Sequence, residues 1–252
     1  MNSQSHIGVF DSGIGGLSVL KALRLELPLE SFIYFADSAN APYGSLSTEE
    51  ILRLVSKHVE FLMEKDSKII VVACNTATGV AIQHLRKSYS IPFVGMEPAV
   101  KPAAALSKTK KIGVLATART FEADHFNSTV KRFAGDVEII VQIGNGLVEM
   151  IEKGIVDSPE LLTLLSGYLK PLVDEGIDQL VLGCTHYPFL IPAIRKIIPD
   201  SITIHDPAPA VAIQTKRVLN EYEGLMKGKR QLEDQFYSSG DQSVLDEILK
   251  WL

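Results

Sequence analysis

The sequence contains two cysteines, and both follow the same kind of segment. Cys74 ends an apolar run that starts near Lys68, and Cys184 ends a run that starts at Gln179. Small polar residues come next in each case. This pattern is typical of a buried strand in an open α/β sheet, where ligands bind beyond the carboxyl ends of the strands. We therefore expect each thiol to lie at a ligand site.

Two thiols that face one carbon atom from opposite sides suit one reaction in particular. Inverting a stereocentre that bears hydrogen requires removal of a proton from one face and return of a proton to the other. A thiol can act as acid or base, but only a few per cent of a cysteine with a pKa of about 8.5 is ionised at pH 7. Such thiols need neighbours that set their ionisation. The alternative is that each cysteine is a small buried hydrophobic side chain.

Three further residues are candidate partners of the thiols. Asp11 ends the first apolar run and would lie beside Cys74. His186 is two residues beyond Cys184, so in an extended chain it points to the same side and could assist proton exchange. Glu152 is another acid that could orient His186. Alternatively, Asp11 caps the next helix and His186 is a structural histidine.

The segment Ser12–Gly16 follows a predicted strand and opens a predicted helix, where free N–H groups favour an anion. It lacks both G-x-G-x-x-G and a Walker lysine, so a carboxylate site is favoured over a nucleotide site. Isolated loop threonines more commonly cap helices, but here they cluster at strand ends. These patterns predict as substrate-binding residues Ser12, Tyr43, Gly44, Asn75, Thr76, Thr117, Thr120, Thr185 and His186.

A metal or cofactor is disfavoured. Cys74, Cys184 and His186 could bind zinc together with Asp11, since a catalytic zinc site uses three protein ligands and water. These residues lack the paired short spacings of common zinc motifs. No lysine lies in a recognisable Schiff-base context for pyridoxal phosphate. We therefore expect neither a metal nor a cofactor.

Strands and helices alternate along the chain. Strands are expected at 7–10, 32–36, 92–95 and before Cys74; helices are expected at 17–27, after a capping box at Ser47 and Glu50, and at 79–87. This alternation predicts a parallel sheet covered by helices.

The pattern then repeats. Ile7-Gly8-Val9 returns as Ile112-Gly113-Val114, and Cys74 is matched by Cys184, roughly 105 to 110 residues later. Two more matches keep this order, Ile33–Phe35 with Ile139–Val141 and Glu97–Ala99 with Asp206–Ala208. The ordered set predicts two pseudo-symmetric α/β lobes with the active site in the cleft between them.

The C-terminal segment has no counterpart in the repeat. It contains a predicted helix after Asp206-Pro207, a strand at 235–238 and a last helix from Ser243 to Trp251. We expect it to cross back onto the first lobe. The predicted first lobe is therefore 1–98 plus 208–252, and the second is 99–207.

Composition sets the broad class. The chain has 252 residues, of which 46% are hydrophobic and 22% charged, with a net charge of −5. These values are typical of a soluble globular protein and do not favour nucleic-acid or membrane binding. The first six residues do not resemble a signal peptide, and no apolar run approaches the ~18 residues of a spanning helix. Two cysteines without an export signal indicate free thiols in the cytoplasm.

Several segments together resemble those of bacterial glutamate racemases: Phe10–Val19, Pro42–Gly44, Ala73–Ala77, Leu182–Pro188 and Phe236–Asp241. The resemblance spans nearly the whole chain. It implies cofactor-independent interconversion of L- and D-glutamate, supplying D-glutamate for peptidoglycan, by a homodimer. It also implies that Cys74 and Cys184 are the acid/base thiols, assisted by Asp11, His186 and Glu152. The substrate-binding segments that it implies are Asp11-Ser12, Tyr43-Gly44, Asn75-Thr76 and Thr185-His186. The chain lacks an N-terminal extension of the kind that some relatives carry with nucleotide-precursor activation.

Two alternatives stay open. The related aspartate racemases share the Cys-Asn-Thr and Gly-Cys-Thr segments, but they usually have an acid where this chain has His186-Tyr187-Pro188, which favours glutamate. A two-lobed protein that binds an acidic amino acid without turnover is the alternative from another class.

Overall fold

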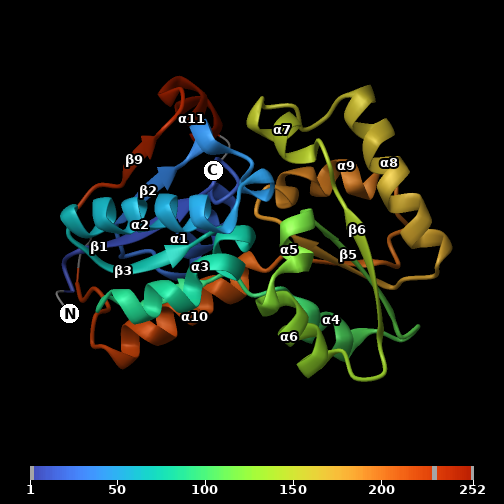
Figure 1. Ribbon diagram of the computed structural model, residues 1–252, viewed down its shortest axis with the longest axis horizontal. Helices are drawn as coiled ribbons and strands as arrows, with labels where there is room; N and C mark the ends of the chain where they lie inside the picture. The colour runs from blue at the N-terminus through green and yellow to red at the C-terminus, as the bar shows by residue number, and fades with distance from the viewer. Residues whose placement is uncertain (1–2, 229–231, 251–252) are drawn as a thin grey trace.

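The computed structural model describes residues 3–228 and 232–250, which form two α/β lobes side by side (Figure 1). The first lobe has a parallel sheet in the order β4-β3-β1-β2-β9, and the second has a parallel sheet in the order β6-β5-β7-β8. The strands are β1 (His6–Asp11), β2 (Phe32–Ala36), β3 (Ser67–Val72), β4 (Phe93–Gly95), β5 (Lys111–Ala116), β6 (Glu138–Ile143), β7 (Gln179–Gly183), β8 (Thr203–His205) and β9 (Gln235–Ser238). The predicted fold class is confirmed.

The two sheets have equivalent strand orders. Strands β2-β1-β3-β4 of the first lobe correspond to β6-β5-β7-β8 of the second. The central glycines correspond too: Gly8 pairs with residues of β2 and β3, and Gly113 pairs with residues of β6 and β7. The repeat in the sequence is therefore a repeat in the structure, and Cys74 and Cys184 follow equivalent strands.

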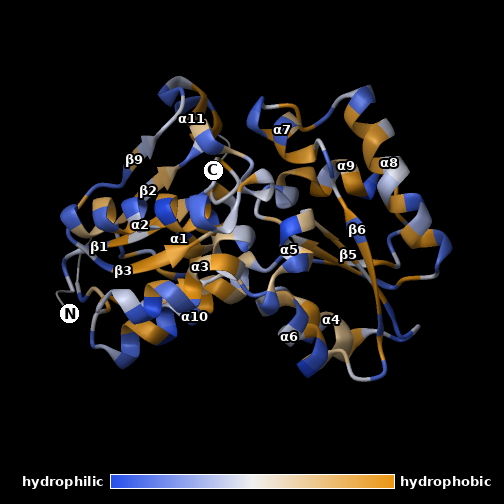
Figure 2. Ribbon diagram, in the orientation of Figure 1, coloured by the Kyte–Doolittle hydropathy of each residue, from blue (hydrophilic) through white to orange (hydrophobic). Residues whose placement is uncertain are grey.

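Helices cover the sheets with their apolar faces inward, as the hydropathy colouring shows (Figure 2). In α2 (Thr48–Glu64), Ile51, Val55 and Val59 are buried, and the predicted capping box of Ser47 and Glu50 is present. The other helices are α1 (Leu17–Glu26), α3 (Asn75–Ser88), α4 (Val100–Leu106), α5 (Ala118–Glu122), α6 (Asp124–Phe133), α7 (Leu147–Glu152), α8 (Pro159–Asp174), α9 (Ile191–Arg195), α10 (Ala208–Glu221) and α11 (Gln242–Leu249), with short 3-10 turns η1 (Ser38–Asn40), η2 (Tyr43–Ser45) and η3 (Tyr187–Leu190).

The helix predicted at 79–87 begins four residues earlier, at Asn75. The physical reason is that Cys74 acts as the N-cap, because its sulfur accepts a hydrogen bond from the Ala77 N–H at 3.4 Å. Serine or threonine usually fills this position. At the other end of the chain, α11 runs from Gln242 to Leu249, and the predicted terminus at Trp251 lies outside the described residues.

The segment that follows the second lobe lies with the first. Figure 1 shows the red C-terminal elements beside the blue N-terminal ones, β9 pairs in parallel with β2, and α10 packs on α1. Asp234 accepts hydrogen bonds from the Arg24 side chain at 2.6 Å and from the Phe32 N–H at 2.9 Å. The division into 1–98 plus 208–252 and 99–207 stays a prediction.

One cluster of buried apolar side chains includes Ile14 and Leu17 from the first lobe and Leu147 and Ile151 from the second. The lobes are therefore packed together in this structure. Within the part of the chain that the structure describes, no helix is both long and apolar enough to cross a membrane.

Candidate active site

A small cavity between the lobes is lined by both cysteines. Its other lining residues are Ser12, Pro42, Tyr43, Gly44, Asn75, Thr76, Thr117, Val148, Thr185 and His186. The enclosed volume is about 10 Å³, which is room for about one water molecule. A second hollow of about 160 Å³ shares Pro42, Gly44, Thr117 and Val148 with it. Both thiols are therefore nearly buried between the lobes, with Cys74 4% and Cys184 7% exposed.

Cys74 lies at the junction of β3 and α3. Its thiol donates to Ser12 Oγ at 3.5 Å and accepts from the Ala77 N–H. Burial and the nearby Asp11 carboxylate raise the pKa of Cys74 above its ordinary value, and the contacts with Ser12 and Ala77 oppose that rise. The surroundings therefore keep Cys74 protonated in the substrate-free protein at neutral pH.

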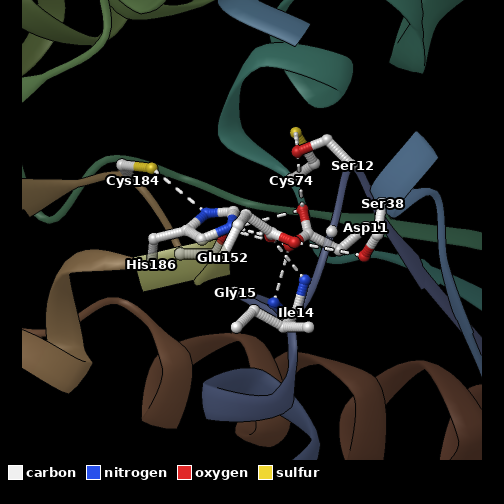
Figure 3. A network of polar contacts seen from close by, with 12 residues as sticks. Asp11, Ser12, Ile14, Gly15, Ser38, Cys74, Glu152, Cys184 and His186 are labelled. Carbon is white, nitrogen blue, oxygen red and sulfur yellow. Dashed lines mark hydrogen bonds and ion pairs between the residues drawn. The ribbon is translucent and has the colours of Figure 1, made fainter. Parts of the chain in front are cut away.

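Cys184 has a different partner. Its sulfur lies 3.7 Å from His186 Nδ1, and His186 Nε2 lies 2.5 Å from Glu152 Oε1 (Figure 3). Burial lowers the pKa of His186, but the contacts with Cys184 and Glu152 outweigh it and raise the pKa well above its ordinary value. The chain Cys184–His186–Glu152 thus favours an imidazolium beside the second thiol.

Asp11 and Glu152 lie behind the cavity lining. Asp11 is fully buried, accepts the Gly16 N–H at 2.7 Å and lies 3.3 Å from Thr185 Oγ1. Burial raises its pKa to about 6, with partial compensation from His186. The structure brings Asp11 close to both thiol systems, since its charge acts on Cys74 and on His186.

The loop that was expected to bind a substrate carboxylate is partly occupied by the protein itself. The Ile14 N–H donates to Glu152 Oε1 at 2.8 Å, and the Gly16 N–H donates to Asp11. The helix start does attract anions, as predicted. The amides of Ile14 and Gly16 thus bind the protein's own carboxylates, those of Glu152 and Asp11. Ser12 is the residue of this loop that lines the cavity.

Two of the predicted substrate-binding residues have hydroxyl groups that contact other side chains of the protein. Thr120 lies behind Thr117, with 2.9 Å between their hydroxyl oxygens. The Tyr43 hydroxyl donates to Asp37 Oδ2 at 2.5 Å and lies 3.0 Å from His58 Nε2, so it is held within the first lobe. In contrast, Asn75 lines the cavity, and its buried Oδ1 has no hydrogen-bond partner among the described residues.

Sequence reasoning missed three residues of this region. Val148 and Pro42 line the cavity, and the Ser38 hydroxyl donates to Glu152 Oε2 at 3.1 Å. Ser38 follows the end of β2, so the rule that singled out the polar residues after the cysteine strands could have found it. Val148 is apolar and gives no such signal.

The zinc alternative would need Cys74, Cys184, His186 and Asp11 to converge as ligands. Across residues 3–228 and 232–250, no group of three or more His, Cys, Asp and Glu side chains is arranged to hold a metal ion. The Asp11, Glu152 and His186 side chains are instead satisfied by each other, by backbone amides and by hydroxyl groups.

The fold and the site together define the class of this protein. It is a two-lobed α/β enzyme in which each lobe contributes one cysteine to a shared cavity. This chain belongs to the Asp/Glu/hydantoin racemase family, whose sequence profile matches residues 18–215. It is 47% identical over 251 residues to a glutamate racemase of Ectopseudomonas mendocina, a match that covers 99% of this chain and 95% of that protein.

Solved structures agree with this assignment. The crystal structure of Escherichia coli glutamate racemase, in complex with L-glutamate and the activator UDP-MurNAc-Ala, superposes with a TM-score of 0.88 at 31% identity and covers 98% of this chain and 95% of that one. The glutamate racemase of Francisella tularensis, in complex with D-glutamate, superposes with a TM-score of 0.84 at 30% identity and covers 98% and 94% of the two chains.

Proposed function

We propose that this protein is a glutamate racemase that interconverts L- and D-glutamate without a cofactor. The observation that carries the proposal is the single cavity lined by Cys74 from one lobe and Cys184 from the other. The relatives named as glutamate racemases, and the two similar structures that contain L- or D-glutamate, support glutamate as the substrate. We also propose that it works in the cytoplasm as a homodimer and supplies D-glutamate for peptidoglycan.

The proposed reaction is a proton exchange at the α-carbon. One cysteine, as thiolate, removes the α-proton from one face, and the other, as thiol, donates a proton to the opposite face. The C–H bond that breaks and the one that forms lie on opposite sides, so the configuration inverts. Afterwards the protonation states of the two cysteines are exchanged, ready for the other enantiomer.

The surroundings of each thiol fit these roles in different ways. Asp11 and Ser12 stand by Cys74, and His186 with Glu152 stands by Cys184. Neutral donors and acceptors such as Asn75, Thr76 and Thr117 line the cavity for the substrate's polar groups. Closed lobes exclude water, which strengthens the electrostatic contacts that stabilise a carbanionic transition state.

The test uses purified protein treated with a chelator and supplied with no cofactor. Circular dichroism should show loss of optical activity from both L- and D-glutamate. Proton NMR in D₂O should show deuterium at the α-carbon. Binding without exchange would indicate an amino-acid-binding protein, and exchange with aspartate but not glutamate would indicate an aspartate racemase; either result contradicts the proposal.

A further inference from the structure

The carboxylate of Glu152 lies at a junction between the two lobes. Glu152 ends α7 in the second lobe, and its Oε1 lies 2.5 Å from His186 Nε2 in the same lobe. The same oxygen accepts the Ile14 N–H of the first lobe at 2.8 Å, and the other oxygen accepts the Ser38 hydroxyl of the first lobe at 3.1 Å (Figure 3). Both carboxylate oxygens are thus held from the opposite lobe.

Ser38 is itself held in place by the C-terminal segment. It begins the turn η1 directly after β2. Next to it, the Ala39 N–H donates to Ser239 Oγ at 3.1 Å, and Ser239 Oγ donates to Asp37 Oδ1 at 2.6 Å. A Cβ on Gly240 would lie 3.2 Å from Ser38 Cβ, which is a tight contact. Because Gly240 has no side chain, Ser38 fits beside it. Contacts within the first lobe therefore hold the backbone next to Ser38 and restrict the space around its side chain.

We propose that Ser38 is a positioning residue that acts through Glu152 on His186. Its hydroxyl orients the carboxylate that pairs with the imidazole, and it can do so only when the lobes are together. Hydrogen bonds to a carboxylate are stronger than those between neutral groups. The histidine beside Cys184 therefore reaches its working state on closure of the lobes. The part of this inference that concerns catalysis rests on the proposed racemase function.

The charged or titratable groups that face His186 are Cys184 from the end of β7, Glu152 from α7 and Asp11 from β1. Of these three, Glu152 is the one that Ser38 contacts by a hydrogen bond. A change at Ser38 thus reaches His186 through a single carboxylate.

The first experiment follows the titration of His186 by NMR of histidine-labelled protein. Ser38→Ala should lower the pKa of His186, because the Glu152 carboxylate that stabilises the imidazolium loses one of the contacts that orient it. Ser38→Thr keeps the hydroxyl and should restore the wild-type titration. Ser88→Ala, at the exposed end of α3, is the matched control and should leave it unchanged.

The second experiment is a double-mutant cycle with Glu152→Ala. Ser38→Ala should reduce kcat/KM about tenfold in the wild-type background, but by less than about twofold when Glu152 is absent, because two residues of one network do not act additively. Unchanged titration in Ser38→Ala, failure of Ser38→Thr to restore it, or additive effects would overturn the proposal. A protein that shows the predicted titration but does not racemise glutamate would refute the proposed function and leave the Ser38–Glu152–His186 coupling in place.

Discussion

The two thiols occupy equivalent positions in the lobes but have unlike neighbours. Cys74 caps a helix and lies beside Ser12, whereas Cys184 lies against an imidazole. L- and D-glutamate have equal free energies in solution, so kcat/KM must be the same in both directions. The different neighbours of the two cysteines can therefore make kcat and KM differ between the enantiomers, but kcat and KM must then change by the same factor.

Replacing either thiol should stop racemisation. Cys74→Ala or Cys184→Ala removes one of the two acid/base groups, and loss of such a group costs about 100- to 10,000-fold in rate. Each single variant should still eliminate HCl from one enantiomer of a β-chloro amino acid, because elimination needs proton removal from one face only. Circular dichroism and chloride release measure the two reactions. Wild-type racemisation by the double Cys→Ala protein would refute the mechanism.

The buried Asp11 should make stability depend on pH. Burial raises its pKa to about 6, whereas an unfolded aspartate titrates at about 3.9. A raised folded-state pKa gives stability that is fully present below pH ~4 and lost as the pH rises through ~6. Asp11→Asn carries no charge to bury. The free energy of unfolding of Asp11→Asn, relative to that of the wild type, should therefore rise by about 2 kcal/mol between pH 4 and pH 8, from ~1.36 kcal/mol per pKa unit.

Urea unfolding at several pH values measures this difference. A constant difference between the two proteins across the range would contradict it. The same variant should be slow in racemisation, since Asp11 lies beside both thiol systems.

At the scale of elements, close approach of loops depends on glycine. A Cβ on Gly15 would overlap the His186 ring, and one on Gly13 would overlap the Glu152 carboxylate. The loop after β1 can therefore meet the second lobe only because these positions have no side chain.

Gly15→Ala should hold the lobes apart and displace His186. We expect kcat/KM to fall by about 100-fold or more, the value of a general acid/base group, with a loss of about 1–3 kcal/mol of stability from overpacking. Gly167→Ala in α8 is the control: nothing lies within 4 Å of its added Cβ, so it should gain up to ~1 kcal/mol from helix propensity and keep its activity. Assays and thermal unfolding of both variants would test this, and equal behaviour would contradict it.

Most helices and strands could be predicted from the sequence, because apolar runs and amphipathic segments directly indicate which residues are buried. β2 and β9 match the predicted ranges, and the repeat located both cysteine strands. The start of α3 was wrong because cysteine is a rare helix cap. The Glu152–Ser38 contact could not be predicted from sequence, since it joins residues 114 positions apart and depends on how the two lobes meet.

At the scale of the whole molecule, the C-terminal segment completes the first sheet. β9 covers the edge of β2, and Ser239 donates to Asp37, which in turn holds the Tyr43 hydroxyl of the cavity loop. The last strand of the chain therefore supports one wall of the active site.

Ending the chain after Lys227 should expose β2 as an unpaired edge strand, which promotes association between molecules. We expect a lower midpoint of thermal unfolding, larger particles in light scattering and loss of racemisation. Asp234→Asn, which weakens the contacts with Arg24 and Phe32 but keeps β9 in the chain, should have a smaller effect of about 1–2 kcal/mol. A shortened chain that melts like the full-length protein would contradict this role.

The same arrangement has a consequence for synthesis of the protein. A chain emerging from the ribosome has all four strands of the second sheet by residue 205, while the first sheet, begun at residue 6, still lacks its outer strand until residue 238. The first lobe, which is translated first, is therefore completed last. Asp37 and its neighbours can form their final contacts only after the C-terminal residues have been synthesised.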